Sequence, residues 1–190
     1  MLCFLDCEFT DLLHPQLLSL GLVTQDGREF YVELDLTTDI GQARKKVSTD
    51  FVYYGVLDFW GLVPGATCTY EEMGRRTAEW LLGLAEESGT RVEVAFDYLT
   101  DYELMEYSIR DSGLWARVRE VVRPINIGQL TGGVDGELAA EEAFRDLKTK
   151  RGLNRHHALA DAIALRAAFM AIREQMLVRD RGTRGQTESE

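Results

Sequence analysis

Short runs of apolar residues, separated by polar or glycine-bearing stretches, recur along the first two thirds of the chain. Runs of this length and composition are typical of β-strands. The pattern predicts five strands, at residues 2–9, 17–24, 28–34, 91–96 and 119–127. The second and third form a hairpin around the Gln25-Asp26-Gly27 turn, and we expect Pro124 to stop the fifth.

Helical periodicity begins at residue 51. Val52, Val56 and Trp60 recur at a spacing of four, which indicates a short buried helix. We expect the other aromatic side chains of residues 51–60 to pack in the core, with stacking on nucleobases as the alternative. A helix over residues 69–89 begins with a capping box and ends at a glycine. Three more helices are predicted, over residues 101–113, 136–152 and 157–179.

The order of the elements is three strands, a helical segment, and then strands that alternate with helices. Such an order predicts an α/β fold in which an antiparallel three-stranded meander and parallel strands form one mixed sheet with helices on both faces. This is the layout of ribonuclease H-like nucleases. With 190 residues we expect a single domain over residues 1–178, in which residues 35–69 are an insertion or connection. Residues 179–190 are expected to form a disordered tail.

Composition and charge narrow the class of protein. Hydrophobic residues make up 45% of the chain and charged residues 28%, which suffices for a substantial core. A net charge of −11 argues against sequence-independent binding of duplex nucleic acid through a basic surface. No apolar run approaches the ~20 residues of a membrane span, and no signal peptide is recognisable. Three cysteines without a CxxC spacing indicate reduced thiols, so we expect a cytoplasmic protein with no membrane partner.

The first predicted strand ends in carboxylates. Alternation places Asp6 and Glu8 on one face of the strand and Cys7 on the other. Adjacent carboxylates at the end of a buried strand are unfavourable unless a cation or a proton compensates them, and a solvated strand end is the plain alternative. Near the other end of the sequence, His156 and Asp161 stand five residues apart at the start of a helix, with Asp161 beside its inward flank.

Two further features bear on chemistry. Asp97 ends the fourth predicted strand and Asp101 begins the next helix, where an N-cap role is the structural alternative. Residues 145–155 hold five basic residues in an otherwise acidic chain. They indicate either a solvated helix face or a phosphate-contacting patch that includes Arg155.

Together these residues resemble the motifs of the DEDDh 3′-to-5′ exonucleases, a family that includes oligoribonuclease and ribonuclease T. The D-x-E-x-T-G motif of that family is similar to DCEFTD at residues 6–11, where Asp11 stands in place of the glycine. The H-x-A-L-x-D motif is matched in full by HHALAD at residues 156–161. The middle motif, an aspartate a few residues after a strand and followed by an apolar pair, is met by Asp101, with Asp97 as the alternative.

The resemblance implies an enzyme that hydrolyses phosphodiester bonds at the 3′ end of single-stranded or short RNA, or of DNA, and releases nucleoside 5′-monophosphates. It implies two divalent cations, Mg²⁺ or Mn²⁺, held by four carboxylates: Asp6, Glu8, Asp101 and Asp161. The general base is then His156, with His157 as the alternative. Contacts with the terminal nucleotide are implied at Phe9, Thr10 and Leu12.

Two other functions are compatible with the same residues. A catalytically silent ribonuclease H-like domain would bind nucleic acid or support assembly without cutting. An endonuclease of the wider ribonuclease H-like class would leave the His156-to-Asp161 spacing unexplained. Because members of the resembled family often dimerise, the expected partners also include a second copy of the chain, in a homodimer.

Overall fold

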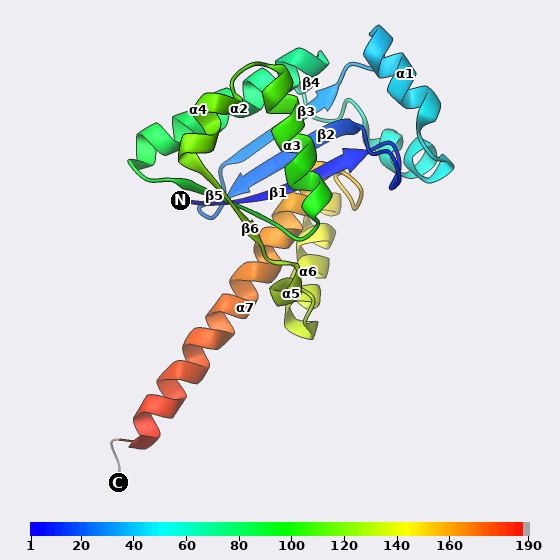
Figure 1. Ribbon diagram of the computed structural model, residues 1–190. Coiled ribbons are helices and arrows are strands. Elements are labelled where there is room, and N and C mark those ends of the chain that lie inside the picture. The colour runs from blue at the N-terminus through cyan, green and yellow to red at the C-terminus, as the bar shows by residue number, and fades with distance from the viewer. Residues whose placement is uncertain (188–190) are drawn as a thin grey trace.

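The computed structural model shows one mixed sheet with helices on both faces, as the sequence predicts (Figure 1), and the sheet has six strands where five were expected. It describes the backbone of residues 1–187 and the side chains of residues 1–177. The expected tail at residues 179–190 therefore lies outside the described side chains, and residues 188–190 lie outside the described backbone. None of the described helices is both long enough and apolar enough to cross a membrane.

The strands lie in the order β4-β3-β2-β1-β5-β6. Their bounds are β1 Leu2–Phe9, β2 Leu17–Thr24, β3 Glu29–Leu34, β4 Thr67–Cys68, β5 Val92–Phe96 and β6 Val122–Asn126. β1, β2 and β3 form an antiparallel meander, whereas β1–β5, β5–β6 and β3–β4 are parallel pairs. This combination is the ribonuclease H-like sheet, which confirms the predicted fold class.

The helices other than α1 form two layers (Figure 1). Their bounds are α1 Asp39–Val47, α2 Tyr70–Ser88, α3 Leu99–Asp111, α4 Trp115–Val121, α5 Gly128–Thr131, α6 Val134–Arg151 and α7 Ala158–Thr187. α2, α3 and α4 cover one face of the sheet, α7 lies against the other face, and α5 and α6 pack on α7. α2 begins with the predicted capping box, in which Thr69 and Glu72 satisfy each other's backbone amides, and ends at the left-handed Gly89.

The prediction for residues 119–127 is wrong in two respects. Helix α4 occupies Trp115–Val121, so the strand begins only at Val122. Pro124 also lies inside β6 instead of stopping it, paired in register with Val94. β6 is an edge strand bonded to β5 alone, so the amide that proline lacks is not needed by a second neighbour.

Side chains of β1 alternate between two cores. Cys3, Leu5 and Cys7 are buried against the α2–α3 layer, whereas Phe4 is buried under α7 with Val23 and Leu165. Burying each large apolar side chain contributes about 1.5–3 kcal/mol. Asp6 and Glu8 continue the row that Phe4 begins, and they therefore face the α7 layer, with Cys7 on the other side as predicted.

Candidate metal centre and active site

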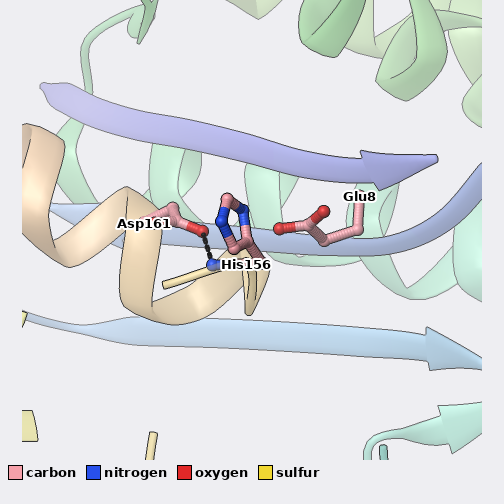
Figure 2. A group of neighbouring side chains, drawn as sticks. All are labelled: Glu8, His156 and Asp161. Carbon is pink, nitrogen blue, oxygen red and sulfur yellow. Dashed lines mark hydrogen bonds between the residues drawn. The ribbon is translucent and has the colours of Figure 1, made fainter. Parts of the chain in front are cut away.

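The end of β1 and the start of α7 bring the predicted carboxylates and histidine together. Single ligand atoms of Glu8, His156 and Asp161 lie within 4.8 Å of one another. Figure 2 shows the imidazole of His156 between the carboxylates of Asp161 and Glu8. About 150 residues separate the two segments along the chain, so the cluster exists only because the sheet and α7 pack together.

A second acidic group adjoins the first. Single carboxylate oxygens of Asp6, Asp97 and Asp101 also lie within 4.8 Å of one another. Asp97 follows β5, which is the parallel neighbour of β1, and Asp101 lies in the first turn of α3. Asp101 is 3% exposed, whereas Asp97 is exposed. The structure thus brings both sequence candidates to Asp6, with Asp101 in the more enclosed position.

The backbone before α7 is held in an unusual conformation. His156 has a φ of +64°, the left-handed region, and among residues 1–187 it is the non-glycine residue with positive φ. Such a conformation costs about 1–3 kcal/mol and persists where neighbouring contacts enforce it. The amide of His156 donates to Oδ2 of Asp161 at 2.8 Å (Figure 2), and the carbonyl of His157 accepts the amides of Ala160 and Asp161.

Glycine at position 21 lets α7 reach the sheet. Gly21 is the register partner of Asp6 on β2, and cross-strand partners point to the same face. A Cβ at Gly21 would lie 2.4 Å from the carbonyl oxygen of Ala158. The absence of a side chain there brings the first turn of α7, and with it His156 and Asp161, directly beside Asp6.

Desolvation disfavours the ionised form of four carboxyls at this site, and repulsion from neighbouring carboxylates adds to it for Asp6, Glu8 and Asp101. The pKa of Asp6 is raised well above its ordinary value by burial and then by the charge of Asp161. Burial, followed by the same neighbour, raises the pKa of Glu8 to about 9. Burial also raises the pKa of Asp101 to about 8, with Asp97 the next cause. The pKa of Asp161 is raised to about 7 by burial, although the amide of His156 opposes the shift.

These groups fit divalent cations. Carboxylate oxygens are the ligands that Mg²⁺ and Mn²⁺ prefer, and two sets of them meet at adjacent points. A bound cation would offset the burial that raises the pKa values of Asp6, Glu8, Asp101 and Asp161 and the repulsion that adds to it for the first three. Burial and the charge of Arg155 lower the pKa of His156, which favours the neutral imidazole that can accept a proton.

The loop after β1 explains how the chain accommodates Asp11 in place of the motif glycine. Oδ1 of Asp11 accepts the amides of Leu13 and His14, both at 2.7 Å. Hydrogen bonding to these amides lowers the pKa of Asp11, chiefly through His14. Asp11 is thus engaged in closing its own loop. Its neighbours Leu12 and Leu13 are left 74% and 86% exposed.

The predicted nucleotide contacts occupy different environments. Thr10 is fully buried, and its hydroxyl and backbone bond to Gln16 and so close the loop. Phe9 is half-buried and stacks on Tyr98 at a centroid distance of 6.3 Å. Leu12 stands at the rim of a cavity of about 550 Å³ beside Glu8, which the sequence did not reveal. Of the three, Phe9 and Leu12 line this cavity.

The far wall of the cavity comes from the connecting segment at residues 35–69. Phe51 lines it and meets the ring of His156 edge-on, with centroids 4.8 Å apart. Val52 and Val56 are buried as predicted. The expected core packing of the neighbouring aromatics is wrong for three of them, because Phe51, Tyr53 and Tyr54 are exposed. Their sequence signal, four aromatics within nine residues, is the same for a core helix and for a binding wall.

The basic stretch at residues 145–155 is largely paired with acidic side chains. Arg155 forms an ion pair with Glu141, Arg151 with Glu29, and Lys150 with Asp146. Arg155 also lies over the ring of Phe144, 4.3 Å from its centroid. Together with Asp6 and Asp161 it lines a second cavity of about 280 Å³, between α7 and the α5–α6 segment. Arg155 is therefore the member of the stretch that reaches the carboxylates.

Comparisons with known proteins find similarity among solved structures. No protein-family model matches the sequence. No curated protein matches it. Among solved structures, the nuclease domain of 3′hExo, a DEDDh family member determined with bound rAMP, is similar over 92% of this chain and 91% of its own. Sequence identity is 15% and the TM-score is 0.41. The ribonuclease H-like class accordingly rests on the strand order and directions described above.

Proposed function

We propose that the protein is a metal-dependent 3′-to-5′ exonuclease acting on single-stranded or short RNA, or on DNA, and releasing nucleoside 5′-monophosphates. The observation that carries the proposal is the meeting of Glu8 from β1 and Asp161 from α7 around the imidazole of His156, beside a second acidic group formed by Asp6, Asp97 and Asp101. A solvated strand end would not require glycine at position 21 or a left-handed histidine at position 156. The DEDDh-like spacing of residues 6–11 and 156–161 supports the same assignment.

Four carboxylates, Asp6, Glu8, Asp101 and Asp161, would hold two divalent cations, with Asp97 beside Asp101 as the alternative ligand. When bound, such cations lower the pKa of water and neutralise charge on the phosphate oxygens. The protein supplies a fixed acidic frame: β1 sets the spacing of Asp6 and Glu8, and α7 fixes Asp161. Ligands drawn from three packed elements resist displacement, which keeps the reacting groups aligned.

His156 is the proposed general base. The conformation of its backbone directs the imidazole toward the gap between Asp161 and Glu8 (Figure 2). The neutral imidazole would accept a proton from the attacking water, and protonated His156 would then lie beside carboxylates that stabilise it. His157 is less suited to this role because its side chain is only 2% exposed.

The cavity beside Glu8 is the proposed site for the terminal nucleoside. Its lining of Phe9, Leu12, Leu13 and Phe51 is apolar and aromatic, which suits the face of an unpaired base. A base held in a duplex is paired and stacked and cannot enter such a cavity, so this cavity favours a free strand end. The net charge of −11 likewise disfavours a long polyanion, and Arg155 is the cation placed to oppose that repulsion.

The proposal is tested with 5′-labelled RNA and DNA oligomers incubated with Mg²⁺ or Mn²⁺. We expect a ladder that shortens from the 3′ end, with loss of the ladder in EDTA and in H156A. A circular oligomer of the same sequence should remain intact, since only an endonuclease cuts it. If folded wild-type protein shortens neither RNA nor DNA with either metal, the proposal fails.

A further inference from the structure

Beneath the proposed base lies an aromatic contact that the reaction does not itself require. The imidazole of His157 stacks on the ring of Tyr31, with centroids 4.4 Å apart and planes 27° from parallel. His157 is 2% exposed, and neither of its ring nitrogens has a hydrogen-bond partner among the described side chains and backbone. The ring of His157 is therefore held by stacking, and Tyr31 is the surface on which it rests.

Tyr31 is in turn fixed by a buried acid. Its hydroxyl donates to Oε2 of Glu33 at 3.0 Å, and Glu33 is 0% exposed. The other oxygen of Glu33 accepts the amide of Gly61 at 2.9 Å and the hydroxyl of Thr67 at 2.7 Å. Both carboxylate oxygens of Glu33 are thus engaged, and the network ties β3 to the connecting segment. A tyrosine anchored in this way has one orientation, unlike an apolar ring in a plain core.

The strand register places this network directly under the candidate active site. Tyr31 is the register partner of Gly21, and Gly21 is the partner of Asp6. Tyr31 therefore shares the α7 face of the sheet with Asp6, two strands away. Because Gly21 has no side chain, the first residues of α7 lie directly against β2 at this position.

His156 is clamped between two contacts. On one side its amide donates to Asp161, and on the other the next residue, His157, is held flat against Tyr31. A left-handed residue without a glycine's freedom persists when its neighbours fix it on both sides. Removing either clamp would let the backbone relax and turn the imidazole of His156 away from Glu8.

We propose that Tyr31, anchored by Glu33, is a positioning residue that acts through His157 to hold His156 in its left-handed conformation. The inference rests on the proposed function in that His156 is taken as the base. The role of His157 is to supply a flat ring, not a proton acceptor. The phenol hydroxyl and the carboxylate of Glu33 serve to orient the ring of Tyr31.

The sharpest test compares H157F with H157A. H157F keeps the stacked ring and discards both nitrogens, so we expect its kcat to stay within about threefold of wild type, whereas H157A should lose about tenfold or more, because small misplacements of a reacting group have large kinetic effects. KM should change little in either variant. A kcat for H157F as low as that of H157A would overturn the proposal and favour a chemical role for the His157 nitrogens.

A second pair of variants, at Tyr31, tests the ring on which His157 stacks. Y31F retains the ring but loses the hydroxyl that orients it, so its loss of kcat should be smaller than that of Y31L, which removes the stack and should lower kcat without a matching rise in KM. The control is F30L, which removes a stack from the same strand but on the opposite face, where Phe30 packs on Trp80. F30L should lower stability and leave the kcat of the folded protein unchanged. Equal losses of kcat in F30L and Y31L would reduce Tyr31 to a structural residue and overturn the proposal.

The backbone of His156 provides a readout independent of activity. We expect the NMR backbone shifts of His156 and the protection of its amide from exchange to change in H157A and to persist in H157F. An unchanged His156 in H157A would refute the positioning role. Wild-type protein that cuts nothing while these shifts behave as expected would instead refute the proposed function alone, so the two failures are distinguishable.

Discussion

Gly21 and Ala158 approach so closely that no other residue can replace the glycine without movement. A Cβ at Gly21 would lie 2.4 Å from the Ala158 carbonyl oxygen and 2.5 Å from its carbonyl carbon. Both of these are backbone atoms, so a rotamer change cannot relieve the clash. The contact joins the middle strand of the antiparallel meander to the first turn of α7, which carries Asp161.

G21A is therefore expected to displace the start of α7. We expect a loss of about 1–3 kcal/mol in the free energy of unfolding, typical of overpacking, and a larger proportional loss of activity as His156 and Asp161 move from Glu8. The matched control is G83A. Gly83 lies in α2 with no atom within 4 Å of the added Cβ, so alanine there should stabilise by about 0.5–1 kcal/mol. Urea denaturation and nuclease assays of both variants check this, and equal effects would contradict it.

The metal-free protein is expected to lose stability as the pH rises from 5 to 9. The pKa values of Glu8, Asp101 and Asp161 are about 9, 8 and 7 in the folded protein, whereas in the unfolded chain they are near 4. The folded state therefore binds protons more tightly than the unfolded chain. The stability that this contributes is lost as the pH rises through the folded pKa values. We expect a fall of at least about 2 kcal/mol.

Urea denaturation in EDTA at pH 5 and pH 8 measures this difference. E8Q removes one titrating carboxyl and should flatten the pH dependence, and Mg²⁺ or Mn²⁺ at pH 8 should restore stability to the wild type. A wild-type protein that is equally stable at both pH values in EDTA would show that folding does not raise the pKa values of these carboxyls.

Substitution by asparagine distinguishes the two candidates for the middle acidic position. Asp101 is enclosed in the first turn of α3, whereas Asp97 is exposed at the end of β5. We expect D101N to lower kcat/KM by about 100-fold or more and to weaken Mn²⁺ binding in calorimetry, and D97N to cost about tenfold or less. A larger effect of D97N in both measurements would exchange the two roles.

Asp11 should affect substrate binding more than turnover. Its Oδ1 accepts the amides of Leu13 and His14, so D11A frees the loop that presents Leu12 at the cavity rim. We expect KM to rise about threefold to tenfold with little change in kcat, and the free energy of unfolding to fall by about 0.5–2 kcal/mol, as for a lost cap. D11N keeps the acceptor oxygen and should resemble wild type. Steady-state kinetics that show D11N and D11A to be alike would argue for a role of the charge.

Local pattern sufficed for the elements whose signals are local. The apolar runs of β1 to β3 and the capping box of α2 depend on neighbours within a few residues, and each was predictable. The two-residue strand β4 was not, because Thr67–Cys68 carries no periodicity and pairs with β3 only once residues 35–66 have folded. Pro124 was expected to end its strand, because proline lacks the amide that a central strand needs. It is tolerated inside β6 because β6 lies at the edge of the sheet.

The candidate site divides in the same way. Asp6, Glu8, His156 and Asp161 could be named from motif spacing, and the structure brings them together. Phe51 could not, because its approach to His156 depends on how the connecting segment returns to the sheet. The left-handed backbone of His156 was equally hidden, since no glycine marks the position. Features fixed by tertiary packing leave little trace in local composition.

The long separation between the two halves of the acidic cluster has a consequence for biosynthesis. Ribosomes deliver Asp6 and Glu8 first, and synthesis proceeds at about 5–20 residues per second. Roughly 150 more amino acids must emerge before His156 and Asp161 can join them. Under the proposed function, a nascent chain therefore has no nuclease activity toward the mRNA that encodes it. The enzyme becomes active only when α7 has packed against the sheet.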